Sequence, residues 1–211
     1  METGKYIIND YLDELSSKAA VPGGGGVAAL SAALGASLAS MVCSLTIGKE
    51  KYKEYEAEVI EIKQQALELQ ESFLKFADDD AHAFLPLSKA YSMPRKTDEE
   101  KAARSQVMQQ ALIAAAEVPF NLIKTCTATI EMYEALLTKG STLAISDVAV
   151  GAEMIITAAS SALLNVYINT KLFADKQSAA EMNQTAEGLV KEIKERLGNV
   201  IEQVKIKVKG S

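Results

Sequence analysis

The chain has 211 residues, of which 48% are hydrophobic and 24% are charged, and its formal net charge is −6. This composition is close to that of average globular proteins and predicts one domain over residues 1–211. An acidic chain without a dense run of Lys and Arg is a poor partner for nucleic acid, because phosphate binding needs a basic surface.

The cysteines argue against a metal-binding or disulfide-rich protein, and the N-terminal stretch argues against a secreted one. Cys43 and Cys126 lie far apart and outside any CxxC or Cys/His cluster. The sequence therefore predicts neither a metal site nor a disulfide framework, and we expect both thiols in the core. The first 18 residues mix charged and apolar side chains without the hydrophobic stretch of a signal peptide. We expect a cytoplasmic protein.

Apolar residues recur at helical spacing along nearly the whole chain, and no sustained alternating run with turn signals occurs. The sequence therefore predicts an all-α fold, a bundle of about six helices. The expected helices cover about 7–18, 27–47, 52–91, 97–139, 146–172 and the stretch from 178 onward. The final VKIKVKG segment alternates like a strand, but we interpret it as a frayed helix end because no partner strand is expected.

Prolines and a capping motif set several of these boundaries. Pro22 closes the first helix, and Pro94 follows the end of the third. Thr97 and Glu100 have the spacing of a capping box, which predicts the start of the fourth helix. Pro119 is expected to kink or restart that helix before it ends at residues 139–140.

The stretch 23–47 runs from four glycines into Ala, Ser, Leu and Gly without a single charge. Its length matches a membrane span, but Ala, Ser and Gly contribute little transfer free energy, so we do not expect a membrane partner. Small residues at four-residue spacing, such as Gly35 and Ala39, predict the close approach of another helix. We expect two central apolar helices, over 27–47 and 146–172, and a homodimer or higher homo-oligomer formed by helix packing.

The glycine run itself has two interpretations. Gly23, Gly24, Gly25 and Gly26 remove every Cβ ahead of the helix and leave N–H groups at its positive end, where an anion or a carbonyl can bind. A plain flexible turn is the alternative. A nucleotide-binding P-loop is not supported, because no strand precedes the glycines and no Lys-Ser/Thr pair follows them.

Four stretches resemble the cyclodeaminase/cyclohydrolase family of folate enzymes, which includes the C-terminal domain of formiminotransferase-cyclodeaminase. They are VPGGGGVAALSAALGASLASMVCSLTIGKEKY, the segment 78–120, ISDVAVGAE and LLNVYIN, which follow one another in the family's order, and the resemblance as a whole covers about residues 5–200. The resemblance implies an all-α oligomer that hydrolyses 5,10-methenyltetrahydrofolate to 10-formyltetrahydrofolate. The alternatives are ammonia-releasing cyclisation of formiminotetrahydrofolate and folate binding without catalysis. No cofactor beyond the tetrahydrofolate substrate is expected.

Carboxylates are the candidate proton-transfer groups, since hydrolysis of an amidinium needs a base for water, an acid for the departing nitrogen and negative charge near the cation. The resemblance implies Asp80 as the leading acid/base, and the alternative is a solvated charge run with Asp78 and Asp79. Asp147 is the second catalytic candidate, and we expect it to cap a helix as well. Glu153 ranks lower because the family pattern does not require it.

Two asparagines are expected at the substrate. Asn165 and Asn169 lie four residues apart on one face of an apolar helix, so their amides point the same way. They are expected to bind the pterin ring, unless they satisfy neighbouring backbone groups. His82 is the single histidine of the chain, and we expect it at the surface.

Basic residues are needed for the anionic glutamate tail of a folate. Arg95 and Lys96, in the segment that matches the family's proline-basic motif, are the expected substrate-binding cations. Lys49 and Lys51 are further sources of positive charge. Ordinary surface charge is the alternative interpretation for all four residues.

Overall fold

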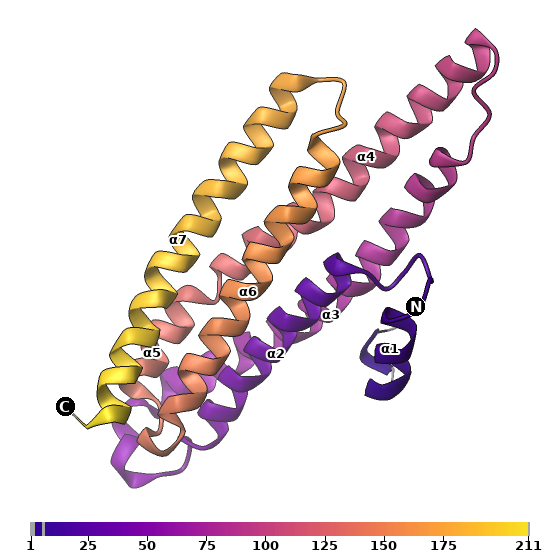
Figure 1. Cartoon of the computed structure of the whole chain (residues 1–211). Coiled ribbons are helices and arrows are strands. Elements are labelled where there is room, and N and C mark those ends of the chain that lie inside the picture. Colours follow the sequence, from indigo (N-terminus) through magenta and orange to yellow (C-terminus); the bar gives the residue numbers. More distant parts are fainter. Residues whose placement is uncertain (1–2, 6, 211) are drawn as a thin grey trace.

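The computed structural model of the chain describes residues 3–5 and 7–210. The described residues form helices joined by short loops, without a strand among them (Figure 1). The α-helices are α1 (Ile8–Leu15), α2 (Gly24–Ser44), α3 (Glu56–Tyr91), α4 (Asp98–Thr127), α5 (Ile130–Lys139), α6 (Ile145–Thr170) and α7 (Lys176–Lys209). The 3-10 helices are η1 (Thr3–Lys5), η2 (Glu50–Tyr55) and η3 (Thr142–Ala144). The all-α prediction is confirmed, and the tail expected as a helix end belongs to α7.

The two apolar helices α2 and α6 lie side by side in the middle of the molecule (Figure 1). They run in opposite directions, since a Cβ at Gly24 would be 3.9 Å from Asn165, and one at Gly35 would be 3.0 Å from the carbonyl oxygen of Gly151. α3 and α4 form a long hairpin beside them, and α7 packs along α6 (Figure 1). The short α1 lies near the start of α2.

Glycines let the backbones of α2 and α6 meet, as the small-residue spacing predicts. A Cβ built on Gly35 would lie 2.8 Å from Cδ1 of Ile155, closer than real side chains pack. A Cβ on Gly151 would lie 2.1 Å from the hydroxyl of Tyr133, which donates a hydrogen bond to the carbonyl oxygen of Gly35 at 2.7 Å. This buried contact joins α2, α5 and α6, and it confirms the close-approach prediction.

The fourth expected helix is divided, but not at its proline. The capping box of Thr97 and Glu100 is present, and α4 then continues through Pro119, which is buried. A helix interior tolerates the loss of one backbone hydrogen bond when packing offsets it. The break comes after Thr127, where the hydroxyl of Thr129 donates to the carbonyl oxygen of Cys126 at 2.7 Å. Such local hydroxyl bonds compete with helical ones, which sequence spacing does not reveal.

Two helix starts also differ from expectation. α2 begins at Gly24 rather than Val27, so most of the glycine run forms the first turn of the helix and Gly23 caps it. α6 begins after Ala144, without a side-chain cap, so the prediction that Asp147 caps this helix is wrong. The turn of η3 leads the chain directly into α6, and Asp147 lies in the first helical turn, where its charge is favourable to the helix dipole.

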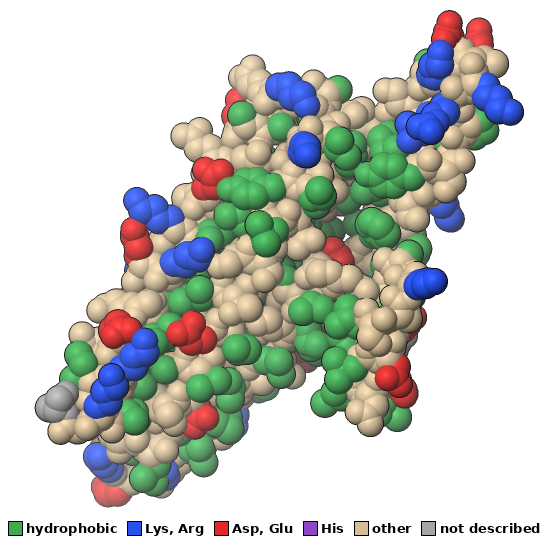
Figure 2. Space-filling model, in the orientation of Figure 1, with side chains coloured by type: hydrophobic (Ala, Val, Ile, Leu, Met, Phe, Trp, Pro, Cys, Tyr) green, Lys and Arg blue, Asp and Glu red, His purple; other side chains and the backbone are tan. Residues whose placement is uncertain are grey.

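By length and composition alone, α2 and the segment Thr142–Thr170 are apolar enough to cross a membrane. In the structure both pack into the helical bundle, with 61% of the apolar window of α2 and 39% of that of the second segment buried. Apolar side chains therefore remain on the outer faces of α2 and α6. Figure 2 shows hydrophobic side chains gathered over these helices, with many of the charged side chains along α7 and toward the ends of the molecule.

Candidate active site

The three consecutive aspartates of α3 have three different environments. Asp78 accepts hydrogen bonds from the backbone N–H and the hydroxyl of Thr3, at 2.8 and 2.6 Å. Asp79 pairs with a lysine one turn earlier on α3. Asp80 accepts a hydrogen bond at 3.1 Å from the backbone N–H of Gly26, in the first turn of α2. The triplet is therefore not a uniform solvated charge run.

The glycine turn makes room for Asp80. A Cβ built on Gly25 would lie 2.0 Å from Oδ1 and 2.4 Å from Cγ of Asp80, so only glycine at this position admits the carboxylate. None of the four glycines has a positive φ, which excludes backbone conformation as the reason for the run. The Gly26 N–H is bound by Asp80 and is not free for a ligand, in contrast to the expectation from the sequence.

The surroundings of Asp80 favour its protonated form more than water does. Burial raises the pKa of the Asp80 carboxyl, and the hydrogen bond from Gly26 opposes this shift. Tyr11 of α1 lies close by, and its pKa is raised by burial and by the charge of Asp80. A half-buried carboxyl group with a raised pKa is suited to take and return a proton.

Asp80 lies in the wall of a cavity of about 240 Å³. The start of α2, the second half of α3, α4 and the end of α6 enclose it. Its lining residues are Ala20, Val21, Gly23, Gly24, Gly25, Asp80, Phe84, Leu87, Tyr91, Ala115, Asn165, Ile168 and Asn169. Such a mostly apolar wall with a few polar groups is typical of small-molecule sites.

The two predicted asparagines lie together in this wall. The amide nitrogen of Asn165 donates to the carbonyl oxygen of Ser161 at 2.9 Å. That of Asn169 donates to the carbonyl oxygens of Asn165 and Ala115, at 2.8 and 3.2 Å. The side-chain N–H groups of both asparagines therefore donate to backbone carbonyl oxygens, as the alternative interpretation expects. Neither side-chain oxygen accepts a hydrogen bond from the described residues, so both remain as acceptors at the cavity.

The other predicted site residues are not among those that line the cavity. Asp147 precedes Asn165 by 18 residues on α6, a helical rise of about 27 Å. Arg95 and Lys96 lie in the loop between α3 and α4, where the backbone N–H of Lys96 donates to Glu100 at 2.6 Å. Among the described residues that line the cavity there is no Lys or Arg.

A second polar group, which we name the far-end cluster, joins the loop after α2 to the loop before α6. Lys49 donates to the hydroxyl of Ser141 at 3.2 Å, and Lys51 donates to that of Thr142 at 3.4 Å. The hydroxyl of Tyr52 accepts the backbone N–H of Thr142 at 2.9 Å, and hydrogen bonds from Thr142 lower the pKa of Tyr52 to about 8. The far-end cluster consists of Lys49, Lys51, Tyr52, Ser141 and Thr142.

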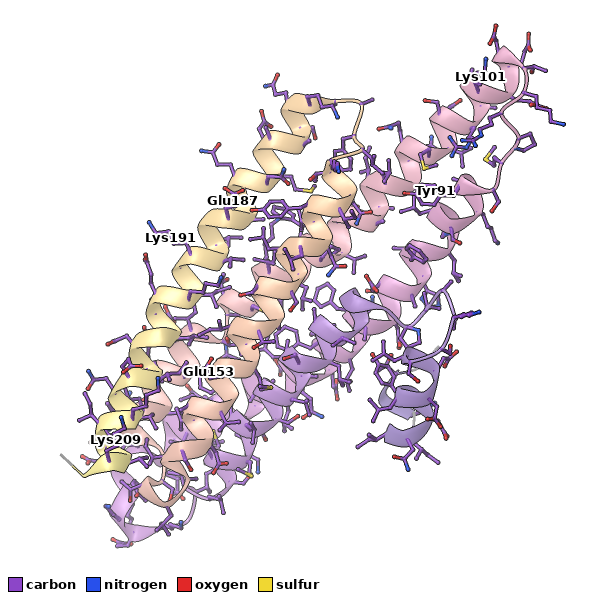
Figure 3. All side chains as sticks on the ribbon, in the orientation of Figure 1. Tyr91, Lys101, Glu153, Glu187, Lys191 and Lys209 are labelled. Atoms are coloured by element: carbon purple, nitrogen blue, oxygen red, sulfur yellow. The ribbon has the colours of Figure 1, made fainter. Side chains whose placement is uncertain are left out.

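Four further residues that the sequence analysis discusses do not line the cavity. Glu153 is exposed on the first half of α6 (Figure 3). The pKa of Lys205 on α7 is raised mainly by its hydrogen bond and charge interaction with Glu202, to which the charge of Glu153 adds. His82 is exposed, as predicted. Burial raises the pKa of Cys43 to about 11 and that of Cys126 to about 12, so both thiols stay protonated in the core. Among the described residues, no three His, Cys, Asp or Glu side chains come together as a metal site.

The sequence interpretation missed the apolar wall of the cavity. Phe84, Leu87 and Tyr91 follow Asp80 at intervals of four, three and four residues, which places all four side chains on one stripe of α3. Figure 3 shows Tyr91 at the end of α3, beside α4. Ile168 lies on the same face of α6 as the two asparagines. These spacings are visible in the sequence once Asp80 is taken as the reference.

Comparisons with known proteins concern the family and the fold of the chain. The family model described as formiminotransferase-cyclodeaminase matches residues 7–188. A methenyltetrahydrofolate cyclohydrolase of Methylorubrum extorquens is 41% identical over 97% of this chain and 99% of its own length. The formimidoyltransferase-cyclodeaminase of Sus scrofa is 30% identical over 93% of this chain, which spans 36% of that protein. A crystal structure of formiminotetrahydrofolate cyclodeaminase from Thermotoga maritima has the same fold, with a TM-score of 0.81 at 24% identity over 99% of this chain and 98% of that one.

Proposed function

Because the chain belongs to the formiminotransferase-cyclodeaminase family, we propose that it hydrolyses 5,10-methenyltetrahydrofolate to 10-formyltetrahydrofolate in the cavity around Asp80. The observation that carries the proposal is the half-buried Asp80 carboxyl, bound to the backbone of α2 and facing a cavity with two amide acceptors. The match to a methenyltetrahydrofolate cyclohydrolase over nearly the whole of both chains supports this choice of reaction.

In the proposed reaction Asp80 takes a proton from water while the water oxygen attacks the methenyl carbon. This gives a tetrahedral carbon bonded to N5, N10 and a hydroxyl group. Asp80 then returns its proton to N5 as the bond from carbon to N5 breaks, and the hydroxyl proton leaves to solvent as the formyl group forms on N10. The cationic substrate and one water thus give the formyl product and one proton. The ionised carboxylate also stabilises the positive charge of the substrate.

The remaining wall residues position the substrate. The free side-chain oxygens of Asn165 and Asn169 accept hydrogen bonds from the N–H groups of the pterin edge. Phe84 and Tyr91 offer apolar ring faces to its flat heterocycle. Adding a side chain at Gly23 or Gly24 would narrow this cavity, because both glycines form part of its wall.

The experiment is to add purified protein to 5,10-methenyltetrahydrofolate and follow the loss of its absorbance against buffer alone. Faster loss than in buffer, abolished by Asp80→Asn, supports the proposal. The cyclodeaminase reaction is the second candidate, because the Sus scrofa relative named formimidoyltransferase-cyclodeaminase matches 93% of this chain. Ammonia release from formiminotetrahydrofolate would favour that candidate. Binding of tetrahydrofolate without turnover in either assay would identify a non-catalytic folate-binding protein.

We also propose that the protein is a cytoplasmic homodimer whose copies pack through the outer faces of α2 and α6. Several large apolar side chains are exposed there, including Leu34 on α2 and Leu164 on α6. Exposed apolar side chains on neighbouring helices support an interface there. The reaction requires no cofactor beyond the tetrahydrofolate substrate. A monomer in light scattering at micromolar concentration would contradict the assembly.

A further inference from the structure

The short helix α1 packs most closely on the rest of the molecule through a tyrosine (Figure 1). Among the residues of α1, all of them described, Tyr11 alone is buried, with 5% of its surface exposed. Ile8 and Leu12 of the same helix are 76% and 52% exposed. The segment before α1 is held separately, by the two hydrogen bonds from Thr3 to Asp78 on α3. These bonds bring α1 close to the part of α3 that carries Asp80.

The first turn of α2 shows where the tyrosine lies relative to the active site. A Cβ built on Gly24 would have Asn165, in the wall of the active-site cavity, as its nearest neighbour. A Cβ on Gly26 would instead lie 3.6 Å from the hydroxyl of Tyr11. The same Gly26 donates its backbone N–H to Asp80 at 3.1 Å. Tyr11 therefore lies against the residue that binds the carboxylate, on another side of the turn from the asparagine.

Two cavities meet the molecule on either side of this contact, and no residue lines both. The active-site cavity has Asp80 in its wall but not Tyr11. The second cavity, of about 360 Å³, lies between α1, α2 and α3, and its wall includes Tyr11 but not Asp80. Apart from Thr3, Gly4 and Tyr11, its wall consists of Ile, Leu and Val side chains. Because Ile8 and Leu12 belong to this wall and are exposed, water can enter the second cavity from outside.

We propose that Tyr11 is a positioning residue whose ring separates Asp80 from the second cavity, so that water reaches the carboxyl only from the side of the substrate. The proposal rests on the proposed function and concerns a residue outside the wall of the active-site cavity. Exclusion of other water strengthens the interaction of a carboxylate with a cationic substrate. It also keeps the carboxyl basic enough to take a proton from the attacking water. Burial is the main cause of the raised pKa of both Asp80 and Tyr11, which agrees with mutual shielding of the two groups.

The other groups around Asp80 leave few rival causes for a change in its pKa. α2 has no charged residue. The residues that α4 and α6 add to the cavity wall are apolar or carry an amide, and none of them titrates. The titratable groups of the surrounding elements are Tyr11 on α1, Tyr91 at the end of α3, the hydrogen-bonded Asp78, the ion-paired Asp79 and the exposed His82.

The first test is the dependence of kcat/KM on pH in variants of Tyr11. Tyr11→Ala opens a path for water from the second cavity, so the pKa of Asp80 should fall toward its ordinary value and the acid limb should move to lower pH. On the plateau kcat should fall by roughly 10-fold, a part of the ~10²–10⁴ that proton transfer contributes, with little change in KM. Tyr11→Phe keeps the ring, so its acid limb should stay at the wild-type position. A shift in Tyr11→Phe as large as that in Tyr11→Ala would overturn the proposal, because the hydroxyl rather than the ring would then be the cause.

Leu12→Ala is the matched control. It removes another side chain from the wall of the second cavity without opening a path to Asp80, so its profile should equal that of wild type. A shift in Leu12→Ala equal to that in Tyr11→Ala would overturn the proposal, since any disturbance of α1 would then have the same effect.

The second test needs no turnover. In protein labelled with ¹³C-aspartate, the carboxyl carbon of Asp80 is assigned by its loss in Asp80→Asn, and its chemical shift is followed against pH. The midpoint should be lower in Tyr11→Ala than in wild type. Tyr11→Leu, which keeps an apolar anchor for α1 but not the ring, should shift it in the same direction. A wild-type midpoint in every folded variant without the ring would overturn the proposal, whereas absence of cyclohydrolase activity in the wild-type protein would contradict the proposed function alone.

Discussion

Gly25→Ala should remove most of the activity through one added methyl group. The new Cβ would lie 2.0 Å from Oδ1 of Asp80, whereas ordinary contacts begin near 3.4 Å, so the carboxylate must move by about 1.4 Å. This displacement stretches or breaks its hydrogen bond to Gly26. A misplacement of about 1 Å in a catalytic group lowers the rate by about 10²-fold, so kcat/KM should fall by that factor.

The effect on stability should be much smaller than the effect on rate. Alanine in place of glycine favours the helix by up to ~1 kcal/mol, which partly offsets the ~1–3 kcal/mol expected from overpacking. The assay combines the absorbance change of methenyltetrahydrofolate with denaturant unfolding. Gly188→Ala is the matched control, since a Cβ there meets nothing within 4 Å and the residue lies on α7, away from the cavity. Its activity should equal that of wild type.

A double variant separates this explanation from a general disturbance of the site. If Gly25→Ala acts by displacing Asp80, it should add little to the loss already caused by Asp80→Asn, because the displaced group no longer takes part in proton transfer. Losses that multiply in the double variant would refute the reasoning. Wild-type turnover in Gly25→Ala would refute it directly.

Three other substitutions give distinct expectations. Asp80→Asn should lower kcat by ~10²–10⁴ with little change in folate affinity in a titration. Burial raises the pKa of the Asp80 carboxyl in the folded state above its value in the unfolded chain. The wild-type protein therefore loses stability as the pH rises between these two pKa values, because the ionised carboxylate is less favourable in the folded state. At pH 7 Asp80→Asn should accordingly unfold no more easily than wild type. A lower midpoint in denaturant would contradict this. Gly35→Leu should disrupt the α2–α6 contact by at least ~1–3 kcal/mol, and unchanged solubility and mass in light scattering would contradict it. Tyr133→Phe should lower the unfolding free energy by ~0.5–1.5 kcal/mol by removing the buried hydrogen bond to the Gly35 carbonyl oxygen, with turnover unchanged; equal stability would argue against that role.

Helices and close contacts could be predicted from the sequence because their signals are local or periodic. The capping box at Thr97 and the small-residue spacing around Gly35 both correspond to features of the structure. The break after Thr127 could not be predicted in the same way, because it depends on hydroxyl bonds that compete with the helix. In the sequence Pro119 is a stronger indication of a helix break than the residues after Thr127, yet α4 continues through this proline.

The site could be predicted only in part, because the directions of the helices decide which motifs meet in space. The resemblance singled out Asp80, Asn165 and Asn169, and the structure brings these three together in one cavity. It singled out Asp147 as well, but α2 and α6 run antiparallel, so this residue lies at the other end of the pair. A linear sequence gives the order of motifs along the chain without showing which helix ends meet.

The hydrogen bond from Gly26 to Asp80 has a consequence for how the site responds to its surroundings. Its donor is a backbone amide, which neither ionises at physiological pH nor changes its oxidation state under cellular redox conditions. A histidine or cysteine in the same place would change its charge with cellular conditions and would shift the pKa of the carboxyl with it. Tyr11, the neighbouring phenol, has its pKa raised above its ordinary value and stays neutral at physiological pH. The acid limb of the pH–rate profile should therefore follow the single ionisation of Asp80 and keep its position under oxidising and reducing conditions alike.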